Sequence, residues 1–176
     1  AGGLGLEAPA ATTPAAEPTQ LSPAVSQVGE RWPVEGRNVG ILVGPDSDVD
    51  AVSTVVDALG AAKLVPLVIA PHGGTLTNDG SSVPISRTYA TARSIEFDAV
   101  VIAGSPAAVQ AKILVDEVFR HYKGIAVLPQ GSDLLLRAGV SDGADGVLSD
   151  SDASALAASL IQSLGEHRVW SRDVAV

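Results

Sequence analysis

The residues of this sequence that could do chemistry follow short apolar runs of the kind that form buried parallel strands. His72, Ser105 and the turn at Asp48 each come just after such a run, and Pro129 follows another. An imidazole can act as an acid or base, a serine hydroxyl as a nucleophile, and a carboxylate can orient either group. Ligands of parallel sheets gather where the carboxyl ends of the strands meet. We therefore expect these positions along one edge of a sheet.

The sharpest predicted turn from strand to helix carries a residue without catalytic chemistry. The apolar run from Ile125 to Leu128 ends at Pro129, and Gly131 precedes a second apolar run. A helix N-terminus offers free N–H groups at such a turn. Proline, however, has no nucleophile, no titratable group and no N–H to donate. We therefore predict a degenerate elbow at Pro129 and no catalytic residues in this chain.

Three weak candidates remain, and each has a simpler structural interpretation. Asp48 precedes a predicted helix, where aspartate is a favoured N-cap. His72 has no serine elbow or second histidine near it in the sequence, so we interpret it as a loop residue. Ser105 and Ser132 have no adjacent base that could activate the hydroxyl. The sequence therefore favours structural roles for all of them.

Two segments resemble known ligand-binding loops, and each also has a simpler structural interpretation. The segment Gly44-Pro45-Asp46-Ser47-Asp48 resembles the phosphate-gripping loop of carboxyaminoimidazole ribonucleotide mutases, in which backbone N–H groups hold the phosphate. The histidine pattern of that family is incomplete here, which favours a plain N-cap. The acidic stretch from Asp142 to Asp152 resembles half of a calcium loop but lacks the closing glutamate. We predict a solvated turn with helix caps there, and no bound metal.

The surrounding elements alternate between strand and helix. Strands are expected around Val39, Val65, Val100, Ile125 and Val147, and helices over 48–60, 106–121, 132–139 and 153–164. Residues 75–86, around Asn78-Asp79-Gly80, predict a hairpin, and residues 87–95 predict a short helix or turn. Pro66 is expected to break the second strand at its edge. The order predicts an α/β fold, a three-layer sandwich with a mainly parallel central sheet.

The composition excludes several classes of function. The formal charge is −9, and the basic residues are scattered, so nucleic acid is not an expected partner. No apolar run is long enough to span a membrane. The chain has no cysteine, which fits a cytoplasmic location, and no methionine, which suggests a piece of a longer protein. Residues 1–36 are rich in proline and alanine and predict a linker or extended arm, with the α/β domain at 37–176.

An ordered set of segments resembles one known family. The segments are Phe97 to Gly104, Asp116 to Lys123, and the strand and helix that lead to Ala138-Gly139-Val140, with Leu4 to Pro9 and Ser22 to Ser26 in the lead-in. Together they are similar to the C-terminal domain of large-subunit haem catalases. That domain is flavodoxin-like and related to the class I glutamine amidotransferase superfamily, which includes PfpI proteases and DJ-1. The resemblance covers nearly the whole chain.

The resemblance implies a non-catalytic accessory domain whose parent enzyme decomposes hydrogen peroxide. Catalytic members of the wider superfamily place a cysteine at the elbow, where this chain has Pro129. The resemblance implies haem in the parent catalase but no cofactor in this chain. It also implies the catalase core and sister subunits as partners, stabilisation of the oligomer, and chaperone-like binding of unfolded proteins by the isolated domain. The alternative is a superfamily hydrolase or glyoxalase, or a phosphate-binding mutase, that uses His72 and the Asp48 loop.

Overall fold

Six parallel strands form the centre of the molecule in a computed structural model that describes residues 26–172. The strand order is β5-β2-β1-β6-β7-β8. The strands are β1 (Asn38–Leu42), β2 (Val65–Ala70), β5 (Arg87–Thr88), β6 (Ala99–Ile102), β7 (Gly124–Val127) and β8 (Val147–Ser149). The α-helices are α1 (Val49–Ala61), α2 (Val109–Arg120), α3 (Ser132–Arg137) and α4 (Ala153–Leu164). The predicted α/β fold is confirmed.

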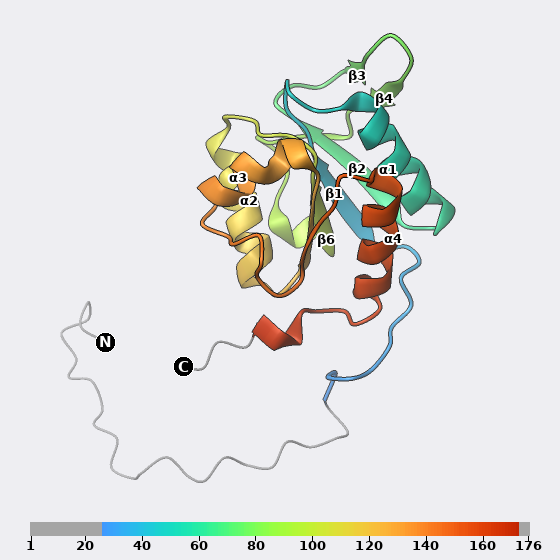
Figure 1. Cartoon of the computed structure of the whole chain (residues 1–176), viewed down its shortest axis with the longest axis vertical. Helices are drawn as coiled ribbons and strands as arrows, with labels where there is room; N and C mark the ends of the chain where they lie inside the picture. The colour runs from blue at the N-terminus through green and yellow to red at the C-terminus, as the bar shows by residue number, and fades with distance from the viewer. Residues whose placement is uncertain (1–25, 173–176) are drawn as a thin grey trace, which may run out of the picture.

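The helices cover both faces of the sheet and so make three layers (Figure 1). Buried side chains of α1 and α4 pack on one face, and those of α2 and α3 pack on the other. The central strands β1 and β6 are paired on both sides and are apolar along nearly their whole length. Such continuous apolar runs are what a parallel strand needs when both of its faces are buried. The loops that join the strands to the helices leave the sheet at the two ends of the strands.

The structure of the segment between β2 and β6 agrees only in part with the prediction from the sequence. The predicted hairpin is confirmed as β3 (Thr75–Thr77) paired antiparallel with β4 (Ser82–Pro84). The short helix or turn expected over residues 87–95 was partly wrong, because Arg87 and Thr88 form β5 and pair with the end of β2. A two-residue strand is too short to leave a periodic signal. The 3₁₀ turn at Ser94–Glu96 follows it.

Two local details correct the sequence interpretation. Pro66 lies inside β2 and does not break it, because the N–H of Val65 points to β1 and the missing N–H of Pro66 falls on the side that β5 does not reach. Helix α2 begins at Val109 rather than near Pro106, since Ala108 is extended at φ −61° and ψ 127°. Pro106 is instead buried beside Gly44.

The predicted arm falls largely outside the described residues, as do its lead-in motifs and residues 173–176. The described part of the arm contacts the domain near the C-terminal ends of α4 and α1. The N–H of Trp32 donates to the carbonyl of Gly165 at 2.8 Å, and the N–H of Gly36 donates to the carbonyl of Lys63 at 2.8 Å. Within residues 26–172, no helix has the length and apolar character that a membrane crossing requires.

Candidate functional site

The candidate site is the crevice at the carboxyl edge of the sheet between β1 and β6. From β1 the chain passes to β2 on one side and then to β6 on the other, so the direction of winding changes between these two strands. Ligands of open α/β sheets bind at such a switch point. Here the crevice lies between the loop from Gly44 to Asp48 and the loop from Gly104 to Pro106.

The side chain of Asp46 occupies this crevice. Its carboxylate oxygens Oδ1 and Oδ2 accept the backbone N–H of Ser105 at 3.0 and 3.1 Å. The Ser47 hydroxyl accepts the N–H of Gly44 at 2.9 Å. A side chain at Gly104 would collide with Ser47 and come within 2.7 Å of the Gly44 nitrogen. The loops are thus in direct contact, and a carboxylate already uses the N–H group that an anionic ligand would need.

Ser105 lies at the expected edge but is held in a structural network. Its hydroxyl donates to the carbonyl of Gln130 at 2.7 Å and accepts the N–H of Leu134 at 3.1 Å. Both partners are backbone groups, and no base accepts the hydroxyl proton. The side chain therefore ties the loop after β6 to the turn after β7, and the geometry lacks the base that an activated serine requires.

Asp48 is the N-cap of α1. Its Oδ1 accepts the N–H groups of Asp50 at 3.0 Å and Ala51 at 3.1 Å. Asp152 caps α4 in the same way through Ser154 and Ala155. These bonds satisfy the free N–H groups of a first helical turn. Within residues 26–172, no three acidic or histidine side chains are grouped as a metal site would need.

His72 is exposed and lies near the start of the Asp48 loop, since Gly44 and Pro45 line the same cavity. It lines a cavity of about 260 Å³ whose wall is mostly apolar and includes Val43, Leu76 and Ile85. Pro129 lines a different cavity of about 300 Å³ with Ser132 and Asp150. Strands β1 and β6 separate the end of β2 from the end of β7. The structure therefore does not bring the imidazole to the elbow.

The elbow itself is a 3₁₀ turn over Pro129–Gly131. Gly131 adopts φ −86° and ψ −11°, and its N–H donates to the carbonyl of Leu128 at 2.8 Å. A side chain at Gly131 would collide with the backbone of Ile102, so the turn is pressed against β6. No residue of this turn has a positive φ. The strained conformation that presents a nucleophile is therefore absent from this turn.

Two residues of this region have roles that the sequence did not indicate. Asp46 is one of several turn residues after β1, and its role depends on a loop that lies 59 positions further along the chain. Tyr89 is buried, and its hydroxyl donates to the carbonyl of Val43 at 2.9 Å. Burial raises the pKa of Tyr89, so the phenol stays protonated. It fixes the end of β1 from which the Asp46 loop departs.

These features define a parallel α/β domain whose switch-point crevice is filled by its own loops. The model of the C-terminal domain found in long catalases matches residues 35–174. The chain belongs to that family, as the resemblance predicted.

Full-length relatives agree with this assignment. The chain is 30% identical over 179 residues to Catalase-2 of Bacillus subtilis and 32% identical over 188 residues to Catalase C of Rhizobium meliloti. It is 29% identical over 187 residues to Catalase HPII of Pseudomonas putida. These alignments cover 98–99% of the chain but only 26% of each relative. The chain thus spans about a quarter of the length of these relatives.

Proposed function

We propose that this chain is a non-catalytic accessory domain of a long haem catalase and stabilises the oligomer of that enzyme. The reaction of the parent enzyme would be the decomposition of hydrogen peroxide, carried out in the part of the polypeptide that this chain lacks. The partners of the domain would be that core and sister subunits. The cysteine-free composition is compatible with the cytoplasm as its location.

The filled crevice between β1 and β6 carries the non-catalytic part of this proposal. Asp46 takes the N–H of Ser105, and the Ser105 hydroxyl is held by two backbone groups. The hydrolase or glyoxalase alternative needs a nucleophile and a base within hydrogen-bond reach, and His72 and Pro129 line separate cavities. The mutase alternative needs free N–H groups for phosphate, and the Asp48 side chain caps those at the start of α1. These contacts favour neither the hydrolase or glyoxalase alternative nor the mutase alternative.

Haem would belong to the core of the parent rather than to this domain. Proteins hold haem iron through His, Cys, Met or Tyr, and the chain has no Cys or Met. The Tyr89 oxygen is buried and bonded to Val43, and the cavity beside His72 is small, at about 260 Å³. Neither Tyr89 nor the surroundings of His72 favour a haem site, and no step of the reaction is assigned to this domain.

The experiment compares the long catalase with a version that ends before residue 26 of this domain. We expect peroxide turnover per haem to stay within about twofold, while the oligomer dissociates at a lower temperature or denaturant concentration. Equal stability of the two forms would contradict the stabilising role. The isolated chain should turn over methylglyoxal, chromogenic esters and peptides only at background level. Turnover that disappears in His72→Ala would instead establish the enzyme alternative.

A holdase activity of the isolated chain is a second proposal, favoured by one group of exposed apolar side chains. Ile95, Val109, Ile113 and Leu136 are exposed on or beside α2, and we call this surface the α2 face. Exposed apolar patches bind other apolar surfaces. Light scattering from a heat-aggregating client protein should fall in the presence of the chain. The Val109→Lys/Ile113→Lys variant should lose this effect if the α2 face carries it.

A further inference from the structure

The two helical faces of the domain differ sharply in exposed apolar surface. On the α2 face, Ile95 is 81% exposed, Leu136 75%, Val109 64% and Ile113 47%. Val109 and Ile113 lie one turn apart on α2, and the elements that carry Ile95 and Leu136 both contact this helix. Among the described residues of α1 and α4, no large apolar side chain is comparably exposed. The α2 face therefore exposes more large apolar side chains than α1 and α4 do, although Val28 and Trp32 are also exposed, at 63% and 42%, in the segment beside the end of α4.

A groove of about 340 Å³ crosses this face between α2 and the segment at residues 90–94. Ala92, Ile113 and Leu114 give it apolar walls, while Arg93 and Glu117 supply polar groups. Apolar pockets with a polar rim are where the side chains that dominate protein interfaces insert. The α2 face thus combines protruding apolar side chains with a recess that can receive one.

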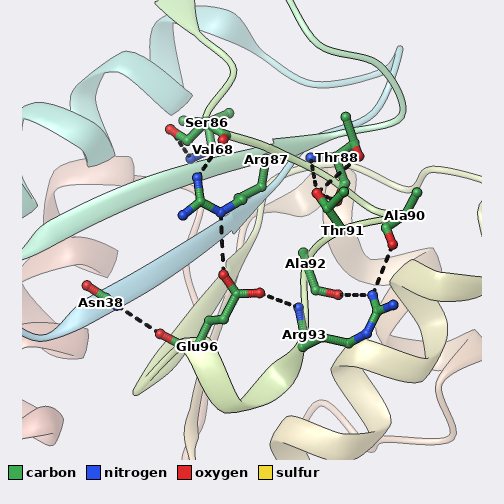
Figure 2. Close-up of polar contacts among 10 residues, drawn as sticks. All are labelled: Asn38, Val68, Ser86, Arg87, Thr88, Ala90, Thr91, Ala92, Arg93 and Glu96. Carbon is green, nitrogen blue, oxygen red and sulfur yellow. Dashed lines mark hydrogen bonds and ion pairs between the residues drawn. The ribbon is translucent and has the colours of Figure 1, made fainter.

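The rim of the groove is held in place before any partner binds (Figure 2). The Arg93 guanidinium donates to the carbonyls of Ala90 at 3.1 Å and Ala92 at 2.8 Å. Glu96 accepts the backbone N–H of Arg93 at 2.7 Å and Nε of Arg87 at 3.4 Å. On the other side, the Ser94 hydroxyl donates to Glu117 of α2 at 2.7 Å. A rim fixed in this way loses little conformational entropy on binding.

Charge distinguishes the α2 face from helix α1. On α2, Asp116 and Arg120 form an ion pair at 3.1 Å, and Lys112 offsets Glu117. The α1 side instead carries Asp48, Asp50 and Asp57, all exposed. In a chain of net charge −9, the α2 face is nearly neutral, as is helix α4, which contains no charged residue. Low charge at the centre is what distinguishes a protein interface from the rest of a surface.

From these observations we propose that the α2 face docks onto the core of the long catalase polypeptide, which rests on the function proposed above. Four exposed apolar side chains and one groove make a small patch, and the largest patch on a monomer, commonly roughly 300–600 Å², is below the about 800 Å² per partner of a standard interface. Free copies would therefore associate weakly. A core in the same polypeptide has an effective concentration in the millimolar range, so a patch of this size suffices.

The size of the missing polypeptide supports this choice of partner. The curated relatives are about four times as long as the region that aligns with this chain, because the alignment covers only 26% of each relative. The domain would thus always be synthesised next to a much larger body. When the domain is isolated, the same face is uncovered, which is the condition under which the holdase activity is expected. The α2 face would therefore account both for docking onto the core and for the holdase activity of the isolated chain.

The test uses the natural absence of cysteine in this chain. Ile113→Cys places a thiol on the α2 face, and Ser159→Cys places a matched thiol on the exposed side of α4. Each variant is made in this chain alone and in the long catalase, and the alkylation rate of that site is followed by peptide mass spectrometry. Ile113→Cys should react at least tenfold more slowly in the long catalase than in the isolated chain. Ser159→Cys should react at similar rates in both.

Three outcomes overturn the docking proposal. Equal rates for Ile113→Cys in the two settings would mean that the core leaves the face open. Protection of Ile113→Cys in the isolated chain that grows with protein concentration would mean that a second copy covers it. Stronger protection of Ser159→Cys would place the core on the α4 side. Oligomer stability and peroxide turnover are measured separately, so a failed accessory role is distinguishable from a wrong docking face.

Discussion

The carboxylate of Asp46 accepts the backbone N–H of Ser105 with both of its oxygens, at 3.0 and 3.1 Å. This contact closes the crevice between β1 and β6, where open α/β folds bind their ligands. The negative charge stands where a phosphate or an oxyanion would otherwise meet the N–H group. The domain has thus converted the usual binding position into a contact that joins two loops.

Replacing Asp46 tests this contact directly. Asp46→Ala removes the acceptor of the Ser105 N–H, and we expect a loss of about 1 kcal/mol in the free energy of unfolding, because the bond is charge-assisted but solvent screens the exposed carboxylate. Urea unfolding measures the change. Asp57→Ala, an exposed position on α1, should change stability by less than about 0.5 kcal/mol. Equal stability of Asp46→Ala and the parent chain would show that the contact contributes nothing.

Gly131 is required by the close approach of the elbow to β6. In Gly131→Ala the new Cβ would overlap the carbonyl of Ile102, and backbone on both sides would have to move. We expect a loss of about 3 kcal/mol. Gly143→Ala is the control, since nothing lies within 4 Å of its Cβ position. Calorimetry or urea unfolding should separate the variants clearly, and similar stabilities would refute the packing argument.

Lys123 is a buried cation that joins β7 to the segment before β6. Its Nζ donates to the carbonyls of Ser94 at 2.7 Å and Phe97 at 2.6 Å, and burial lowers its pKa. Lys123→Met leaves both carbonyls without this donor, so we predict a loss of about 2 kcal/mol. Lys112→Met at an exposed position of α2 should be nearly neutral. A more stable Lys123→Met would mean that the desolvation cost of the ammonium exceeds the value of its bonds.

The lowered pKa of His167 predicts that the domain becomes less stable at mildly acidic pH. Burial, together with Arg168 and Arg37, lowers its pKa below the ordinary 6.5. The unfolded chain therefore takes up the proton more readily than the folded chain, and stability falls as pH drops through 6.5 toward the folded-state pKa. The melting temperature should decline between pH 7.5 and 5.5, and less so in His167→Asn, which tolerates the φ of 65°. Identical pH profiles would contradict this role.

The Pro129→Cys variant tests whether the surroundings of the elbow lower the pKa of a thiol placed there. The cavity beside Pro129 holds Ser132 and Asp150, and His72 lines a different cavity. A thiol there should keep a pKa near or above the ordinary value of about 8.5, because a nearby carboxylate disfavours the thiolate. The chain has no other cysteine, so the alkylation rate against pH reports this thiol alone. A midpoint well below neutrality would reveal a retained catalytic environment.

The sequence by itself determined the order of the main strands and helices, β5 excepted, and the chemistry of the elbow. The apolar runs at Val39, Val100 and Ile125 predict buried strands because a central parallel strand needs apolar side chains on both faces. Pro129 excludes a nucleophile whatever the fold, since that property belongs to the residue alone. The N-cap role of Asp48 was equally local and depends on the first turn of α1.

Only the tertiary structure decided which strands pair and which loops contact each other across the sheet. Strand β5 exists because Arg87 and Thr88 meet the free edge of β2, which no periodicity in two residues could predict. Asp46 fills the crevice because the switch in winding brings β6 beside β1 and places Ser105 next to a loop distant in sequence. Contacts between residues far apart in the chain depend on strand order and register, and these are set by the packing of the whole domain rather than by any single segment.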